Sequence, residues 1–181
     1  MRGDLPPLAL SVRQPSAWAI IHGGKDIENR TIGSVRAGWM VPRRICIHAA
    51  VGLTEKEYRY IAYRMGEVGC TAPPPDELVR RAIIGTVEVV DIIKPGETDS
   101  PWMARQSATE QSRGLVLRAP QPIDPIPAAG ALGYFEWEKS GTIAQPAAWM
   151  KTWGRANGDA ETGDLFGASE QAFANPPERP W

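Results

Sequence analysis

The sequence has few cysteines, few histidines and no long apolar run. Its two cysteines, Cys46 and Cys70, are too few and too isolated for a disulfide framework or a Cys-x-x-Cys metal site. Only two histidines are present, and neither has a close acidic partner, so we expect no metal and no cofactor. No apolar stretch approaches the roughly 18 residues of a membrane span, and the first seven residues lack the apolar region of a signal peptide. These absences predict a cytoplasmic protein with no membrane partner.

A large charge of either sign is also missing. The chain has 20 basic and 21 acidic side chains and a net charge of −1, so bulk positive charge cannot hold a long nucleic acid to it. The basic residues are mostly arginines in short groups, such as residues 43–44 and 80–81. The planar fork of arginine suits phosphate better than lysine does. Each group is either scattered, solvated charge or a local phosphate contact.

Short apolar runs separated by turn residues predict an α+β domain. We expect strands at residues 8–12, 26–31, 43–50, 82–93, 115–118 and 131–137, and helices at 15–22 and 54–65. Residues 33–38 and 94–113 are expected to be loops, and the proline-rich stretch 121–127 an edge strand or a connection. Many short strands with two to three short helices between them predict a small β-barrel whose ends the helices close.

The composition changes after residue 138, which predicts a domain at residues 6–138 and an extension at 139–181. Residues 144–153 are expected to form a short helix with Trp149 and Trp153 on one face, and the rest is weakly structured because it is rich in Gly, Ala, Asp and Pro. These tryptophans, with Trp181, either dock on the barrel or bind a protein partner.

Residues 10–30 gather polar groups in one place. A helix that begins near Pro15 exposes unpaired backbone N–H groups, which favour an anion, and Arg13 and Gln14 lie at that end. Gly23 and Gly24 then turn the chain back, so Lys25, Glu28 and Arg30 are expected near the same opening.

The polar edge of a base needs both donors and acceptors. Glu28 can accept from an exocyclic amine, whereas Gln14 and Asn29 can both donate and accept. The structural alternative is that Glu28 and Arg30 pair with Arg13 or Lys25 and only stabilise the turn.

Three further side chains are candidates. His48 ends a strand and is either a general acid or base or a hydrogen-bonding partner of a backbone carbonyl. Trp102, in a polar loop, either stacks on a base, which is worth about 1–3 kcal/mol, or covers the apolar end of the barrel. Trp18 offers a second ring near the helix start.

Six short motifs occur in an order that resembles the ASCH family, named for homology to a transcription coactivator domain. They are RQPSA at residues 13–17, GGKDIENR at 23–30, IHA at 47–49, IGTV at 84–87, SPW at 100–102 and GALG at 130–133. The resemblance covers roughly residues 8–137. It implies a PUA-like barrel related to domains that recognise RNA or modified bases.

Relatives in that family include nucleic-acid binders, ribonucleases and amidohydrolases of a modified cytidine. The amidohydrolases use a Lys-x-x-Thr pair; Lys25 matches the lysine, but Glu28 occupies the threonine position. A carboxylate does not replace a hydroxyl nucleophile, which argues against that activity. Ser16 also stands where the family usually has tryptophan, so Trp18 would have to supply the ring.

We therefore predict a module that binds single-stranded nucleic acid, RNA in particular, or a standard or modified nucleotide, in a pocket of the barrel. Its binding residues would be Arg13, Gln14, Trp18, Asn29, Arg30 and Trp102. The alternative is a hydrolase, either a ribonuclease or a nucleoside amidohydrolase, that uses the same pocket, with Lys25, Glu28 and His48 as catalytic residues. A third hypothesis is a protein partner bound through the C-terminal extension.

Overall fold

The computed structural model describes residues 4–104 and 111–154, which form one six-stranded sheet with four helices around it. The sheet has the order β2-β5-β4-β3-β1-β6, and β1 and β3 run parallel while the other neighbours are antiparallel. The strands are β1 Leu8–Val12, β2 Ile27–Thr31, β3 Arg43–Ala49, β4 Ala82–Ile93, β5 Ser112–Pro127 and β6 Tyr134–Glu136. The helices are α1 Ser16–His22, α2 Ile32–Ala37, α3 Glu55–Glu67 and α4 Ala148–Lys151.

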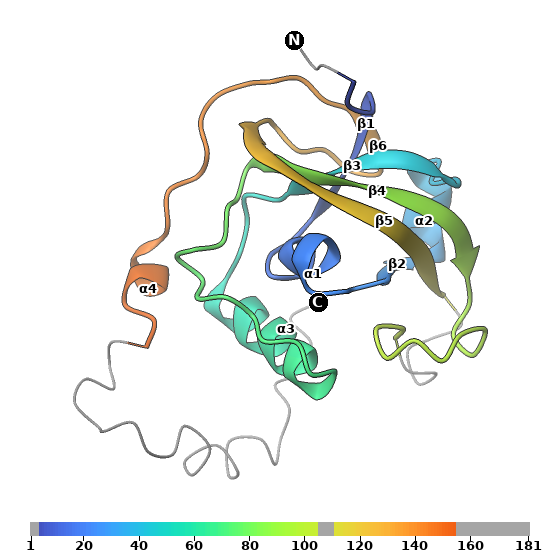
Figure 1. Ribbon diagram of the computed structural model, residues 1–181, viewed down its shortest axis with the longest axis horizontal. Coiled ribbons are helices and arrows are strands. Elements are labelled where there is room, and N and C mark those ends of the chain that lie inside the picture. The colour runs from blue at the N-terminus through green and yellow to red at the C-terminus, as the bar shows by residue number, and fades with distance from the viewer. Residues whose placement is uncertain (1–3, 105–110, 155–181) are drawn as a thin grey trace.

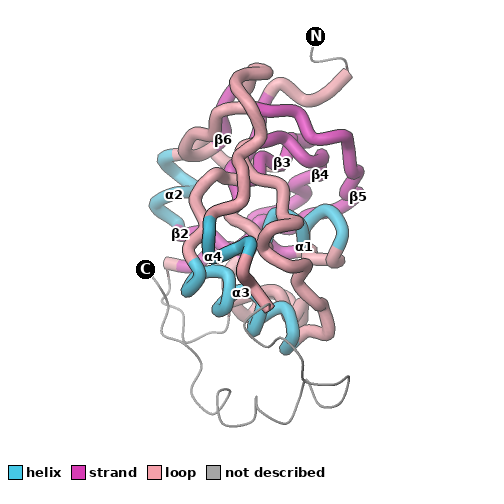
Figure 2. The backbone as a smooth tube through the Cα atoms, turned by 90° about the vertical axis from the view of Figure 1, so that its left-hand side faces the viewer, coloured by secondary structure: helices cyan, strands magenta, loops and turns pink. Residues whose placement is uncertain are grey.

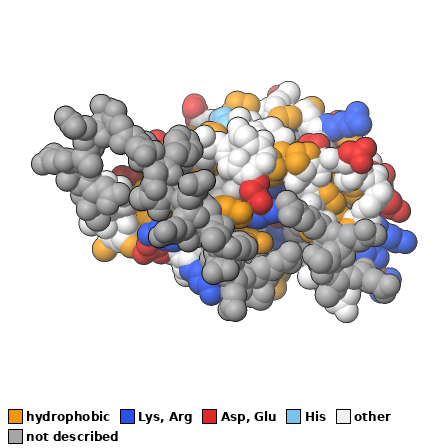
Figure 3. Space-filling model, turned by 90° about the horizontal axis from the view of Figure 1, so that it is seen from below, with side chains coloured by type: hydrophobic (Ala, Val, Ile, Leu, Met, Phe, Trp, Pro, Cys, Tyr) orange, Lys and Arg blue, Asp and Glu red, His pale blue; other side chains and the backbone are white. Residues whose placement is uncertain are grey.

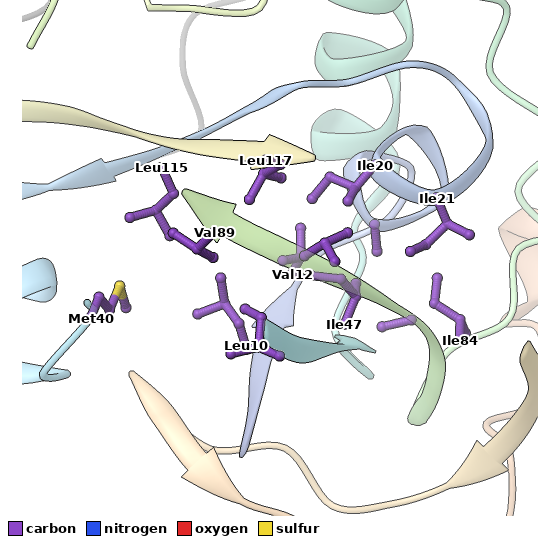
Figure 4. Close-up of a cluster of buried hydrophobic side chains, with 14 of the residues drawn as sticks. Leu10, Val12, Ile20, Ile21, Met40, Ile47, Ile84, Val89, Leu115 and Leu117 are labelled. Atoms are coloured by element: carbon purple, nitrogen blue, oxygen red, sulfur yellow. The ribbon is translucent and has the colours of Figure 1, made fainter. Parts of the chain in front are cut away.

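The sheet curls around α1 into a half-barrel, with β2 and β6 as its edge strands (Figure 1). The main core lies between α1 and the concave face, where Leu10, Ile20 and Ile47 are almost fully buried (Figure 4). The helix packs directly on β4 at Gly85. A Cβ there would lie 2.6 Å from Ile21 Cδ1 and 2.7 Å from the backbone carbonyl oxygen of Gln121, so glycine is required at this position.

The predicted α+β class is confirmed, and residues 8–12 and 82–93 form strands with the predicted bounds. The segments predicted at 115–118 and 121–127 are one long strand, β5. Its neighbour β2 pairs only with residues 112–116. The proline-rich residues 121–127 of β5 therefore pair with β4 on one side and with no described strand on the other. Proline is tolerated there because this part of the strand needs N–H donors on one side only.

The predicted loop at residues 33–38 is wrong, because residues 32–37 form α2. The Thr31 side chain caps this helix by accepting from the Ser34 N–H at 3.1 Å, and the Gly38 N–H donates to the Ser34 carbonyl at its end. None of the residues of α2 is buried, so the helix has no apolar stripe that a sequence pattern could reveal.

The first part of the C-terminal extension packs on α3 (Figure 2). Met150 in α4 is fully buried, and the Trp153 ring lies 4.8 Å from the Tyr58 ring in an edge-to-face arrangement. Residues 155–181, with Trp181, lie outside the described part of the chain, so the predicted weakly structured tail stays a prediction, as does the domain boundary at 138. Across residues 4–104 and 111–154 no helix combines the length and apolarity that crossing a membrane requires.

Candidate functional site

Three charged side chains from β2 and the turn before it form a cluster, here called the seam cluster: Lys25, Glu28 and Arg30. Lys25 Nζ lies 2.9 Å from Glu28 Oε2, and Arg30 Nη2 lies 3.1 Å from Glu28 Oε1. Lys25 also donates to the Ile27 carbonyl. Lys25 and Glu28 are only 7% and 8% exposed. Two cations share one carboxylate, which leaves the cluster with an excess of positive charge.

Arg30 joins the edge strand β2 to β1 across the open side of the half-barrel. Its Nη2 donates to the Ser11 carbonyl at 2.7 Å, just beyond Leu10, where the pairing between β1 and β6 ends. The cluster therefore has a structural function. The alternative interpretation of the sequence expected Glu28 and Arg30 to pair with Arg13 or Lys25; Glu28 pairs with Lys25, but the partner of Arg30 is Glu28. A functional role would have to be combined with this one.

Glu28 stays ionised in this cluster. Burial by itself would raise the pKa of the carboxyl group, but the charges and hydrogen bonds of Lys25 and Arg30 outweigh burial and lower it. Both carboxylate oxygens are occupied, so Glu28 is poorly suited to deliver a proton. The Nε of Arg30 is also buried and has no hydrogen-bond partner among the described residues.

Asn29 holds the loop that carries Trp102 against β2. Its Nδ2 donates to the Trp102 carbonyl at 2.8 Å, and its Oδ1 accepts from the Ala104 N–H at 2.8 Å. The Ser100 hydroxyl adds a bond to Asp26 Oδ1 at 2.5 Å. These bonds place the Trp102 ring centroid 5.9 Å from Lys25 Nζ, within cation–π range. Asn29 thus positions Trp102, and both ends of its amide are already used.

The structure gives Gln14 and Arg13 partners outside the seam cluster. Gln14 is buried; its Nε2 donates to the Val79 carbonyl at 2.7 Å and its Oε1 accepts from the Trp18 N–H at 2.9 Å. Arg13 forms an ion pair with Glu57, the buried carboxylate of the capping box that begins α3. Trp18 packs against the apolar cluster of α3, with its ring 5.7 Å from the His22 ring. These predicted binding residues therefore connect α1 to its neighbours.

His48 is buried with both ring nitrogens in use. Nε2 lies 3.1 Å from the Ala128 carbonyl and Nδ1 lies 3.0 Å from Ser11 Oγ. A carbonyl only accepts, so Nε2 carries the proton and Nδ1 accepts from the serine hydroxyl. Burial lowers the pKa of the imidazole, which keeps it neutral at pH 7. The predicted role as a general acid or base therefore has no support from these contacts, which match the carbonyl-bonded alternative.

The interior offers little room for a ligand. A cavity of about 110 Å³ is lined by Ile20, Gly24, Lys25, Asp26, Val87, Leu117 and Pro120. Pockets for drug-sized molecules occupy about 300–1,000 Å³, so this one suits water or a small group. A wider hollow of about 390 Å³ is lined by Ala129, Glu136, Trp137, Glu138 and Ser140, and its two carboxylates are unfavourable for phosphate. Neither of these two hollows therefore fits a nucleotide.

Charges of both signs are present on the surface. Where side chains are described on the face seen in Figure 3, basic and acidic groups are interspersed and form no continuous basic field. Within residues 4–104 and 111–154, no group of three His, Cys, Asp or Glu side chains is placed to hold a metal ion.

A scan of the chain against models of protein families finds no match, and a search of curated proteins finds none either. Among solved structures, the chain is similar to the ASCH protein of Zymomonas mobilis. One mutant of that protein is 18% identical, with 66% of this chain and 74% of that chain covered and a TM-score of 0.36. A second mutant is 16% identical, with 80% and 91% covered and a TM-score of 0.36. The unmutated protein is 16% identical, with 80% and 90% covered and a TM-score of 0.34. At such low identity and TM-score, the roles of individual residues rest on the contacts within this chain.

Proposed function

We propose that this chain is a binding module of the ASCH type for a nucleotide or single-stranded RNA, with its site over the seam cluster. Arg30 would bind a phosphate group, with Lys25 supplying charge from below, and the Trp102 ring would stack on the base. Asn29 would act by holding Trp102 in place.

The proposal is supported above all by the excess positive charge of the seam cluster, in which Lys25 and Arg30 share the single carboxylate of Glu28. Arg30 is also the most accessible member of the cluster, with 23% of its side chain exposed. Its planar guanidinium matches the geometry of phosphate, and a phosphate would offset the charge that Glu28 alone does not neutralise.

Hydrolysis is less well supported. Lys25 donates to two protein oxygens and Glu28 accepts from two cations, so neither is free to act as nucleophile or base. His48 has no free nitrogen. Catalysis would require these bonds to break when the substrate binds.

Calorimetry with the full chain tests the proposal. The ligands are the four ribonucleoside 5′-monophosphates, modified nucleosides and short single-stranded RNA. Trp102→Ala should weaken binding about 5- to 150-fold, because stacking is worth about 1–3 kcal/mol per base, and Trp102→Phe should restore part of the loss. Arg30→Lys keeps the charge but loses the fork, and should weaken binding as well.

Arg59→Gln is the matched control, since Arg59 lies on α3 and pairs with Glu55. It should bind as the wild type does. If the folded wild-type protein binds none of these ligands at millimolar concentration, the proposed function is wrong.

A further inference from the structure

Two exposed apolar side chains lie on either side of a glycine contact between α2 and β6. A Cβ at Gly38 would lie 2.6 Å from Gly133 Cα, so the two backbones touch there. The neighbouring side chains, Trp39 and Leu132, are 84% and 98% exposed. With Val41, also exposed, they form what we call the Trp39 patch. Exposed large apolar groups gathered in one place mark interaction sites more often than single ones do.

The turn after α2 presents Trp39 to solvent. The Trp39 N–H donates to the Arg36 carbonyl at 3.3 Å, and the Met40 N–H donates to the Val35 carbonyl at 3.1 Å. These two bonds form the Schellman motif that ends α2, and the residue after its C-cap adopts the left-handed conformation, which explains the φ of 48° at Trp39. The turn therefore fixes the backbone of Trp39 while its ring stays outside the core.

Arginines flank the Trp39 patch. Arg36 and Arg43 are both exposed, and neither forms an ion pair or a side-chain hydrogen bond with another described residue. An aromatic ring between unpaired arginines is the composition of a stacking platform for single-stranded nucleic acid. A protein partner would need complementary acidic groups as well as apolar ones, whereas a phosphate backbone supplies the negative charge itself.

Tyr134 connects the Trp39 patch with the seam cluster. Its hydroxyl donates to the Val41 carbonyl at 3.3 Å, and its N–H donates to the Gly38 carbonyl at 3.2 Å. Tyr134 pairs with Leu10 in the ladder of β1 and β6, and Arg30 donates to the carbonyl of Ser11, the next residue on β1. The backbone of Tyr134 therefore links the Arg30 contact to Gly38, the residue before Trp39.

We infer that Trp39 is a second base-stacking site and that the ligand is a single strand of at least two nucleotides. One base would stack on Trp102 and another on Trp39, and Arg30 and Arg43 would bind the phosphates between them. This inference rests on the proposed function, because it extends the same site along the edge of the half-barrel.

The test compares nucleoside monophosphates with single-stranded RNA of about two to six nucleotides, using calorimetry on the full chain. In the wild type, affinity should increase with length. Trp39→Ala should weaken the binding of the oligomers about 5- to 150-fold and leave the affinity for monophosphates unchanged. Trp39→Phe should keep most of the increase in affinity with length. Trp39→Gly removes the ring and accepts the left-handed backbone, so it controls for misfolding. Val51→Ala, at an exposed valine (54%), is the matched apolar control.

Salt dependence tests the arginines. The slope of log K against log salt is about −0.7 for each phosphate contact with a single strand. Arg43→Gln should therefore reduce the slope by about 0.7 for oligomers. Arg59→Gln, on α3, should leave it unchanged.

The inference is overturned if oligomers bind no more tightly than monophosphates and Trp39→Ala does not change their affinity. In that case, monophosphate binding that depends on Trp102 would still support the proposed function. If oligomer binding needs Trp39 but not Trp102, the second site stands and the proposed first site fails. A dimer in sedimentation that Trp39→Ala dissociates would show that a second copy covers the patch, which also overturns the inference. If the folded protein binds neither ligand, both proposals fail.

Discussion

Replacing Glu28 with glutamine removes the only carboxylate of the seam cluster and should destabilise the fold strongly. Lys25 and Arg30 would then lie close together without a counter-charge, and glutamine can accept one hydrogen bond but cannot neutralise either. Breaking a buried ion pair costs about 3–5 kcal/mol, and we expect the lower end because Arg30 is partly exposed. For a chain of this size, that is a fall in Tm of about 6–12 °C. Lys25→Met should cost less, since Arg30 still pairs with Glu28.

Urea unfolding at pH 7, followed by fluorescence and circular dichroism, measures this free energy. Glu55→Gln is the control: it removes an exposed ion pair with Arg59 on α3 and should change the unfolding free energy by less than about 1 kcal/mol. The lowered pKa of Glu28 adds a second signature. Its stabilising contribution should be present above pH 4.5 and lost as the pH falls through the folded-state pKa. The reasoning is refuted if Glu28→Gln is no more costly than Glu55→Gln.

Two other changes test the surroundings of the site. Burial lowers the pKa of His48 below 6.5, so as the pH falls the unfolded chain binds this proton before the folded one does. The unfolding free energy should therefore fall as the pH drops from 7 to 5.5, by at most about 1.4 kcal/mol per pH unit. His48→Gln should flatten this slope in urea titrations. An equal slope in the variant would mean that another group causes it. Met150→Ala should cost about 2–5 kcal/mol in the same assay, because the side chain is fully buried between α4 and α3. A cost below about 0.5 kcal/mol would show that the extension does not dock in solution.

The parts of the fold that the sequence predicts are those governed by local physics. The capping box of Thr54 and Glu57 marks the start of α3, and the β-branched run at 82–93 marks β4. Helix α2 escapes prediction because it is short, contains Gly33 and has no fully buried residue, although Val35 packs against the core. The strand β5 is split in prediction because its prolines are normally excluded from a ladder, and their tolerance depends on where the neighbour β2 stops.

The candidate site divides in the same way. Lys25 and Glu28 are three residues apart, so their contact follows from local geometry, and the sequence predicts it. The partner of Gln14 is Val79, 65 residues away, and no pattern indicates that its amide is already occupied. Ser11 and Tyr134 carry no motif either. They matter because Arg30 donates to the Ser11 carbonyl and Tyr134 pairs with the preceding residue, Leu10, and both contacts depend on the topology of the whole sheet.

The central claim is that a nucleotide binds over the seam cluster, beside Trp102. A titration of the ¹⁵N-labelled full chain with short single-stranded RNA, followed by two-dimensional NMR, tests it most directly. The account predicts that the Trp102 indole N–H, the Arg30 Nε–H and the backbone amides of residues 27–31 shift together and saturate. Shifts confined to the hollow around residues 129–140, with those signals unmoved, would contradict it.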